Sequence, residues 1–158
     1  MFRILDKTAY LIFALVAALV GCGASGPAYK AAASSDNSLA TIYIYRPKTL
    51  FNWGGSPGVF LDGNREFDLK MGGYGVLRVK PGKHVIIVKG RTLIDNWYPG
   101  PVTMELNLSA GSESYLRLRP KGVVVPAGNI VTTSSSAELL LLDKDKALPE
   151  LTKMRSSQ

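Results

Sequence analysis

The chain has little of the chemistry on which most enzymes depend. Its 158 residues include one cysteine and one histidine. A single cysteine excludes an internal disulfide, and these two residues alone leave no transition-metal site of recognisable spacing. The two glycine pairs, Gly54-Gly55 and Gly72-Gly73, do not stand between a strand and a helix. We therefore expect no phosphate-binding loop. We therefore predict no cofactor, no metal site and no catalytic residue, and we predict that the protein is not an enzyme.

The chain also lacks a hydrophobic run long enough for a membrane span. Residues 8–20 carry no charge, but a spanning helix needs about 20 apolar residues. Arg3 and Lys7 precede this run, and the small residue Gly21 follows it. A basic start, a short apolar core and then small residues are typical of a secretory signal peptide. We therefore predict that the N-terminus is a signal peptide.

The lone cysteine stands directly after the apolar run. Leu19-Val20-Gly21-Cys22 resembles the lipobox of bacterial lipoproteins, although an incidental buried cysteine is the alternative. The resemblance implies that residues 1–21 are removed by cleavage between Gly21 and Cys22. It also implies that Cys22 carries diacylglycerol and a further acyl chain of the palmitate type. Gly23, rather than Asp, resembles the class sent to the outer membrane. The expected location is the cell envelope, lipid-anchored to the outer membrane, on its periplasmic or its surface side.

The predicted cleavage takes the net charge from +7 to +6, because it removes two basic residues and one acidic residue. An exported basic chain has anionic lipid, lipopolysaccharide or wall polymer as its acidic neighbours, and we expect no nucleic-acid partner. Residues 22–38 are then the lipidated cysteine and a flexible tether, because they are small, polar and without periodicity. Such a tether reaches roughly 20–24 Å.

Residues 39–143 alternate between apolar and polar side chains in short runs separated by glycine and proline, which predicts an antiparallel β-sandwich of about seven to nine strands. Asp62-Gly63 predicts a tight hairpin turn, and Pro81-Gly82 predicts a looser return between two strands. Ala137–Leu142 is compatible with a strand or a helix. Residues 144–158 read as a short C-terminal helix and tail. The expected strands are 40–46, 58–63, 65–70, 75–80, 83–89, 102–108, 114–120, 129–134 and 137–143.

Two features of the predicted sandwich are candidates for binding. Basic residues alternate along two strands and share one face, which predicts a basic outer sheet surface; they are Arg78, Lys80, Arg117 and Arg119. Trp53, Trp97 and Tyr98 lie in loop-like surroundings, where aromatic rings bind sugars or protein partners. Alternatively, the tryptophan rings fill the open ends of the sandwich. The only histidine, His84, opens a strand after a turn, and we interpret it as structural.

Several short motifs follow one another in an order that resembles a family of bacterial, mostly proteobacterial, lipoproteins with a domain of unknown function. The motifs are Ile42–Pro47, Val59–Gly63, Gly73-Tyr74, Pro81–His84 and Leu108–Gly111 with Tyr115–Arg117. Leu-Asp-Gly followed by Pro-Gly-x-His is also similar to PEGA-type surface modules. Neither resemblance implies a catalytic residue.

The predicted function is that of a membrane-anchored, non-enzymatic envelope lipoprotein that contacts another envelope protein or itself. The alternative is a glycan- or cell-wall-binding lipoprotein that uses the tryptophan loops and the basic face.

Overall fold

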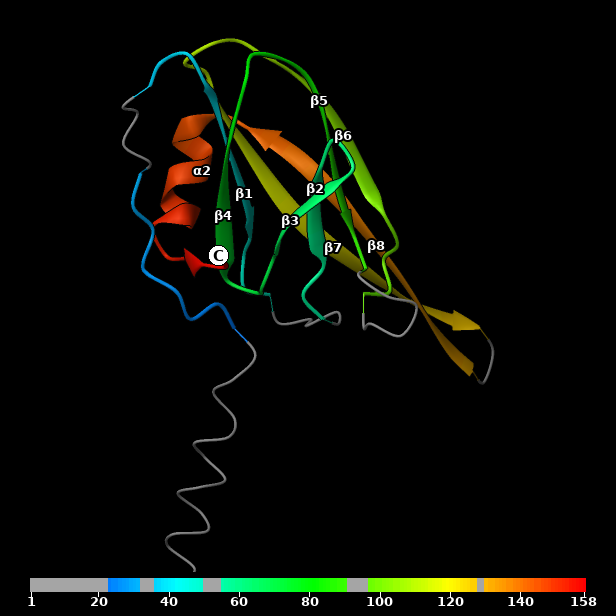
Figure 1. The fold of residues 1–158 in the computed structure, drawn as a ribbon. Helices are drawn as coiled ribbons and strands as arrows, with labels where there is room; N and C mark the ends of the chain where they lie inside the picture. The colour runs from blue at the N-terminus through cyan, green and yellow to red at the C-terminus, as the bar shows by residue number, and fades with distance from the viewer. Residues whose placement is uncertain (1–22, 32–35, 50–54, 91–96, 128–129) are drawn as a thin grey trace, which may run out of the picture.

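Two β-sheets packed face to face form the body of the protein, and one helix covers the outer face of the larger sheet (Figure 1). The computed structural model describes residues 23–31, 36–49, 55–90, 97–127 and 130–158, and it describes 123–127 and 130–134 by their backbone only. The prediction of an all-β sandwich with a short C-terminal helix is confirmed. Within these residues, no helix is long and apolar enough to span a bilayer.

The larger sheet has five strands in the order β8-β7-β1-β4-β9. The strands are β1 (Ala40–Arg46), β4 (Gly73–Val79), β7 (Glu113–Ala127), β8 (Ile130–Leu142) and β9 (Arg155–Ser156). The smaller sheet has four strands in the order β3-β2-β5-β6. Its strands are β2 (Gly58–Leu61), β3 (Asn64–Asp68), β5 (Gly82–Lys89) and β6 (Val102–Leu108).

The sequence predicted antiparallel pairing throughout, but two strand pairs are parallel. β1 pairs in parallel with β7, and β4 pairs in parallel with β9. A parallel pair needs a long crossover, and here the chain between β1 and β7 passes through the smaller sheet. The expected return at Pro81-Gly82 is likewise wrong. β4 and β5 belong to different sheets, so this turn, with Gly82 at φ 136°, is a corner between layers.

The other turn prediction is confirmed. β2 and β3 form a hairpin in which Leu61 pairs with Asn64 around Asp62-Gly63. Asp62 has φ 49° and Gly63 has φ 87°. Positive φ at both central residues is the type I′ geometry that matches the twist of the flanking strands.

Ala137–Leu142 is a strand and belongs to β8, which also absorbs the strand expected over 129–134. β7 and β8 pair from Tyr115 with Leu142 to Ala127 with Ile130. In Figure 1 they extend beyond the rest of the sandwich as a two-stranded arm.

β1 is the most deeply buried strand, because all seven of its residues are buried. Ile42 and Ile44 point into the space between the sheets, where they pack with Leu116, Leu118 and Ile86. Period two then places Tyr43 and Tyr45 on the opposite, outer face. They are buried there as well, within a second cluster.

α2 (Lys144–Leu151) supplies most of the cover for that outer face. Ala147 and Leu151 are fully buried against the tyrosines of β1. The helix ends at Leu151. Residues 155–156 then form β9 beside the start of β4, so the predicted C-terminal tail is a part of the sheet.

Replacement of Leu116 by alanine tests the core directly. Leu116 is fully buried and pairs with Leu141, which is 57% exposed. We expect Leu116→Ala to lower the free energy of unfolding by about 2–5 kcal/mol, measured by urea denaturation. The matched control Leu141→Ala should change it by less than about 1 kcal/mol. Equal losses in the two variants would contradict this placement of the core.

Candidate functional site

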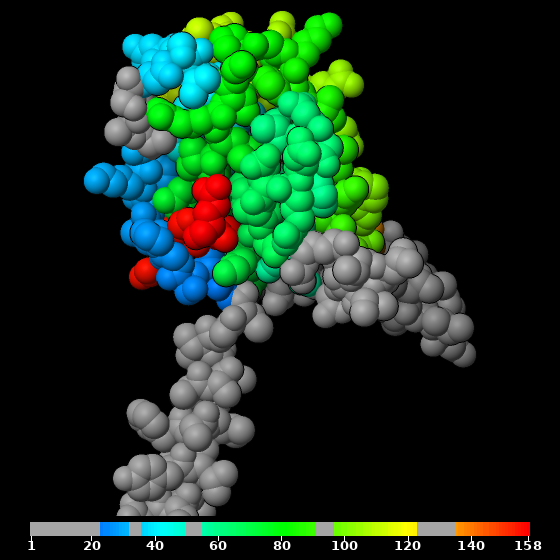
Figure 2. Space-filling view, in the orientation of Figure 1, coloured from blue at the N-terminus to red at the C-terminus, as the bar shows by residue number. Residues whose placement is uncertain are grey.

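The described N-terminal segment, residues 23–31, lies against the body of the protein. Gly23 forms a parallel bridge with Met71, and the backbone N–H of Ala24 donates to the Met71 carbonyl at 3.1 Å. Further along, the N–H of Gly26 donates to Ser156 at 3.2 Å. Figure 2 shows this segment (blue) next to the C-terminal residues (red). The sequence predicted a flexible tether over 22–38, whereas the structure places residues 23–31 against the domain.

Close approach of the backbones explains why small residues stand in this segment. A Cβ at Gly26 would lie 2.5 Å from the Ser156 carbonyl oxygen, so any larger residue would force the two chains apart. Ala28 forms an antiparallel bridge with Arg155, whose guanidinium donates to the Gly26 carbonyl at 3.3 Å. The small-residue composition thus serves the docking of the segment.

Tyr29 fixes the far part of the segment. Its ring centroid lies 5.3 Å from that of Tyr74, with an edge-on geometry, and 6.0 Å from that of Tyr43. Tyr43 in turn stacks on Tyr115 with centroids 4.9 Å apart. Burial, followed by the neighbouring Tyr43, raises the pKa of Tyr29 to about 12. These rings form an aromatic cluster that joins the N-terminal segment to β1, β4 and β7.

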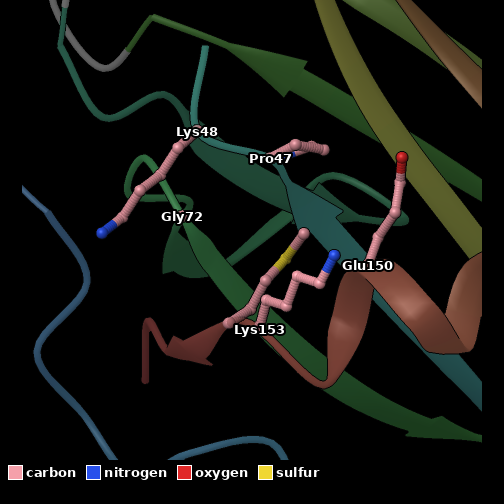
Figure 3. Close-up of a pocket in the computed structure, with 6 residues that line it drawn as sticks. Pro47, Lys48, Gly72, Glu150 and Lys153 are labelled. Atoms are coloured by element: carbon pink, nitrogen blue, oxygen red, sulfur yellow. The ribbon is translucent and has the colours of Figure 1, made fainter.

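A hollow of about 270 Å³ lies at the same end of the sandwich as Gly23. Lys48 follows β1, Gly72 precedes β4, and Glu150 and Lys153 come from α2 and the residues after it (Figure 3). Glu150 forms an ion pair with Arg117 at 2.9 Å. In Figure 3, Lys48 points away from Glu150.

The predicted basic outer face is covered only in part. Arg117 is half-buried beside Glu150, and Arg119 pairs with Glu138. α2 and the N-terminal segment cover the tyrosines between these strands. Two of the four basic residues of this face are thus in ion pairs, and the other two, Arg78 and Lys80, are exposed.

The aromatic residues proposed for binding have different environments. Trp97 is 6% exposed and belongs to the core. Its Nε1–H donates to the Gly100 carbonyl at 2.8 Å, and the buried Arg46 guanidinium lies 5.4 Å from its ring. Burial lowers the pKa of Arg46. Trp97 therefore fills the end of the sandwich, as the alternative interpretation held, and it is not placed to stack on a ligand.

Tyr98 is 69% exposed, and it is thus the one of the three predicted binding residues that the structure shows at the surface. Trp53, Gly21 and Cys22 lie outside the described residues. The sequence did not predict a role for the side chain of Arg46. A fully buried arginine at the end of a strand gives no sequence signal beyond its position after alternating apolar residues.

His84 is held by hydrogen bonds beside the hairpin turn, consistent with the structural role inferred from the sequence. Its Nδ1 lies 2.7 Å from an Asp62 carboxylate oxygen, and its Nε2 lies 2.8 Å from the Lys80 carbonyl. The other Asp62 oxygen accepts the Val85 backbone N–H at 2.9 Å. No group of three His, Cys, Asp or Glu residues suited to a metal ion occurs among the described residues.

The contacts of Tyr29 predict that it holds the N-terminal segment in place. We expect Tyr29→Ala to speed hydrogen exchange at the amides of Ala24, Gly26 and Ser156 about tenfold, because each lost aromatic contact contributes roughly 0.5–1.5 kcal/mol. Tyr98→Ala is the matched control and should leave these amides unchanged. Unchanged exchange in Tyr29→Ala would show that the segment is held by other contacts.

The His84–Asp62 pair predicts a pH-dependent contribution to stability. Asp62, followed by the Lys80 carbonyl, raises the pKa of His84 above 6.5. The Val85 amide, followed by His84, lowers the pKa of Asp62 below 3.8. The histidine's stabilisation is therefore complete below about pH 6.5 and is lost as pH rises through its raised pKa, whereas that of Asp62 is lost only in strong acid.

The free energy lost in His84→Gln should accordingly be larger at about pH 5.5 than at about pH 8.5, as measured by urea denaturation. Lys83→Gln, one residue away, should show no such difference between the two pH values. A loss in His84→Gln that is the same at both would contradict the ion pair.

The family comparison places most of the sandwich in one family. Residues 36–132 match the model described as "Protein of unknown function (DUF2846)". No curated protein and no solved structure matches the chain. The matched range runs from just before β1 into the start of β8. The chain therefore belongs to the DUF2846 family of proteins of unknown function.

Proposed function

We propose that this protein is a bacterial envelope lipoprotein, anchored in the outer membrane through acyl chains on Cys22. The supporting observation is the order of the N-terminal residues: a basic start, an apolar run, then Leu19-Val20-Gly21-Cys22. The docked segment supports the same proposal. Its first described residue, Gly23, already contacts the folded domain, so that removal of residues 1–21 would leave the sandwich and its docked segment intact.

The role proposed for the anchored domain is non-enzymatic, as a structural or interaction module in the envelope. Its side-chain carboxylates support this, because six of the ten in the described residues are in ion pairs within the fold. Asp62 holds His84 and the backbone of β5. Glu113 binds Lys144 at 2.6 Å and accepts the Tyr115 hydroxyl at 2.8 Å. The likeness to proteobacterial lipoproteins and to PEGA-type modules in the order of motifs agrees with such a role.

The second candidate, a glycan- or wall-binding module, has less support. Stacking on a sugar requires an exposed aromatic face, and Trp97 does not offer one. Tyr98 is exposed, but one tyrosine alone does not make a binding platform. The interaction module is therefore the preferred proposal.

Metabolic labelling tests the anchor. We expect cells given labelled fatty acid to incorporate the label into the wild-type chain, and Cys22→Ala to carry none, because the thioether requires the sulfur. Immunoblotting controls for the amount of each protein. Serine at position 109, which lies in an exposed turn, provides a neutral control variant, Ser109→Ala, that should label fully. Equal labelling of wild type and Cys22→Ala would refute the anchor.

A further inference from the structure

Positive charge is concentrated at one end of the sandwich. We call this the anchor end; it is where β1 ends, where β4 and β9 begin, and where Gly23 lies. Its basic residues outside the core and outside ion pairs with carboxylates include Lys48, Lys70, Lys89, Lys153 and Arg155. The carboxylates described nearest to it are each paired with an arginine; they are Asp68, Glu138 and Glu150.

The opposite end has balanced charge. It is where β4 ends, β5 and β7 begin and α2 starts. Its acidic residues are Asp36, Asp62, Glu113, Asp143 and Asp145. Its basic residues are equal in number and are Arg78, Lys80, Lys83, Lys144 and Lys146. Several of these form ion pairs with each other, such as Lys144 with Glu113. The net positive charge of the described domain therefore lies mainly at the anchor end.

Three lysines of the anchor end are available to an external anion. Lys48, Lys70 and Lys153 form no ion pair within the described part of the chain. Lys48 and Lys153 line the hollow of about 270 Å³. Lys48 lies across Gly72, where an added Cβ would be 2.7 Å from its Cε. The absence of a side chain at Gly72 thus lets Lys48 extend over the surface.

These lysines surround the point at which the N-terminal segment meets the domain. Gly23 pairs with Met71, and Met71 stands between Lys70 and Gly72, over which Lys48 lies. Residues 24–29 are hydrogen-bonded to the domain, so they provide no slack between it and residue 22. Acyl chains on residue 22 would therefore enter the bilayer directly beside the lysines.

We propose that the anchor end lies on the membrane surface and that Lys48, Lys70 and Lys153 bind the phosphates of anionic phospholipids. This inference rests on the proposed lipidation of Cys22. Each lysine close to an anionic surface strengthens binding about fivefold, and a basic patch combined with an acyl chain gives stable attachment. Tyr98, exposed just before β6 at this end, is a residue type that favours the membrane interface.

The test uses the full chain, produced in a diderm bacterium and reconstituted into phosphatidylcholine vesicles with or without phosphatidylglycerol. An alkylated Cys22 has no free thiol, so one introduced cysteine can carry a fluorophore. Thr152→Cys reports on the anchor end, and Ser109→Cys reports on the opposite end; both positions are exposed. Lipids with a nitroxide headgroup quench a fluorophore that lies near the surface.

We expect several-fold stronger quenching at position 152 than at position 109 in vesicles containing phosphatidylglycerol. The ratio should approach one in phosphatidylcholine alone and in high salt, because salt screens these charges. Lys48→Glu with Lys153→Glu should abolish the difference. The matched control, Lys80→Glu with Lys83→Glu at the opposite end, should preserve it.

Three results would overturn the proposal. Equal quenching at the two positions in anionic vesicles would show that the domain has no fixed orientation. Loss of the difference in inorganic phosphate, but not in chloride of equal ionic strength, would identify a site for free phosphate instead. Thiol labelling of the wild-type chain would show that Cys22 is free, which overturns the lipid anchor and this inference together. If the wild-type chain does not label but the quenching is equal at the two positions, only the proposed orientation is overturned and the anchor stands.

Discussion

Burial of β1 on both faces is the constraint on which the rest of the structure depends. Its isoleucines fill the space between the sheets, and its tyrosines need cover on the outer side. A sheet face that carries tyrosines and has no second sheet to pack on must bury them under other elements. Here α2 and the N-terminal segment provide that cover. The short helix and the strand after it are therefore integral to the fold, although they come last in the chain.

The same constraint fixes the direction in which the chain leaves the domain. Tyr29 packs on Tyr43 and Tyr74, and from there the segment extends back to Met71 at the anchor end. Backbone hydrogen bonds at Ala24, Gly26 and Tyr29 hold it along this path. An anchor attached before Gly23 would consequently hold the domain in one orientation and against the bilayer. A flexible tether would have allowed all orientations within its reach.

Much of the architecture could be predicted from local patterns. Alternating side chains identified the strands, and Asp62-Gly63 identified its hairpin, because a type I′ turn needs residues that tolerate positive φ. The parallel pairing of β1 with β7 could not be predicted, since it depends on which sheet each strand joins. Pro81-Gly82 suits a hairpin and a corner between sheets equally well.

The candidate site was harder to predict than the fold. Residues 23–31 contact the domain mainly through backbone groups, which any sequence supplies. The signals that could have indicated docking were Gly26, required by close approach, and Tyr29, an aromatic residue in an otherwise small and polar stretch. Trp97 lies in a stretch with the composition of a binding loop, but it is buried in the core beside Arg46, which is distant in sequence. The role proposed for Lys48, Lys70 and Lys153 rests on their common position at the anchor end, which the sequence alone does not reveal.

The central claim is that the chain directly after residue 22 is docked on the domain. The distance between spin labels at Ser25 and Thr152, both exposed, tests it most directly, in the full chain carrying Cys22→Ser so that only the two introduced thiols react. A docked segment predicts a single, narrow and short distance distribution, which broadens in Tyr29→Ala. A broad distribution in the chain with Tyr29 intact would contradict the account.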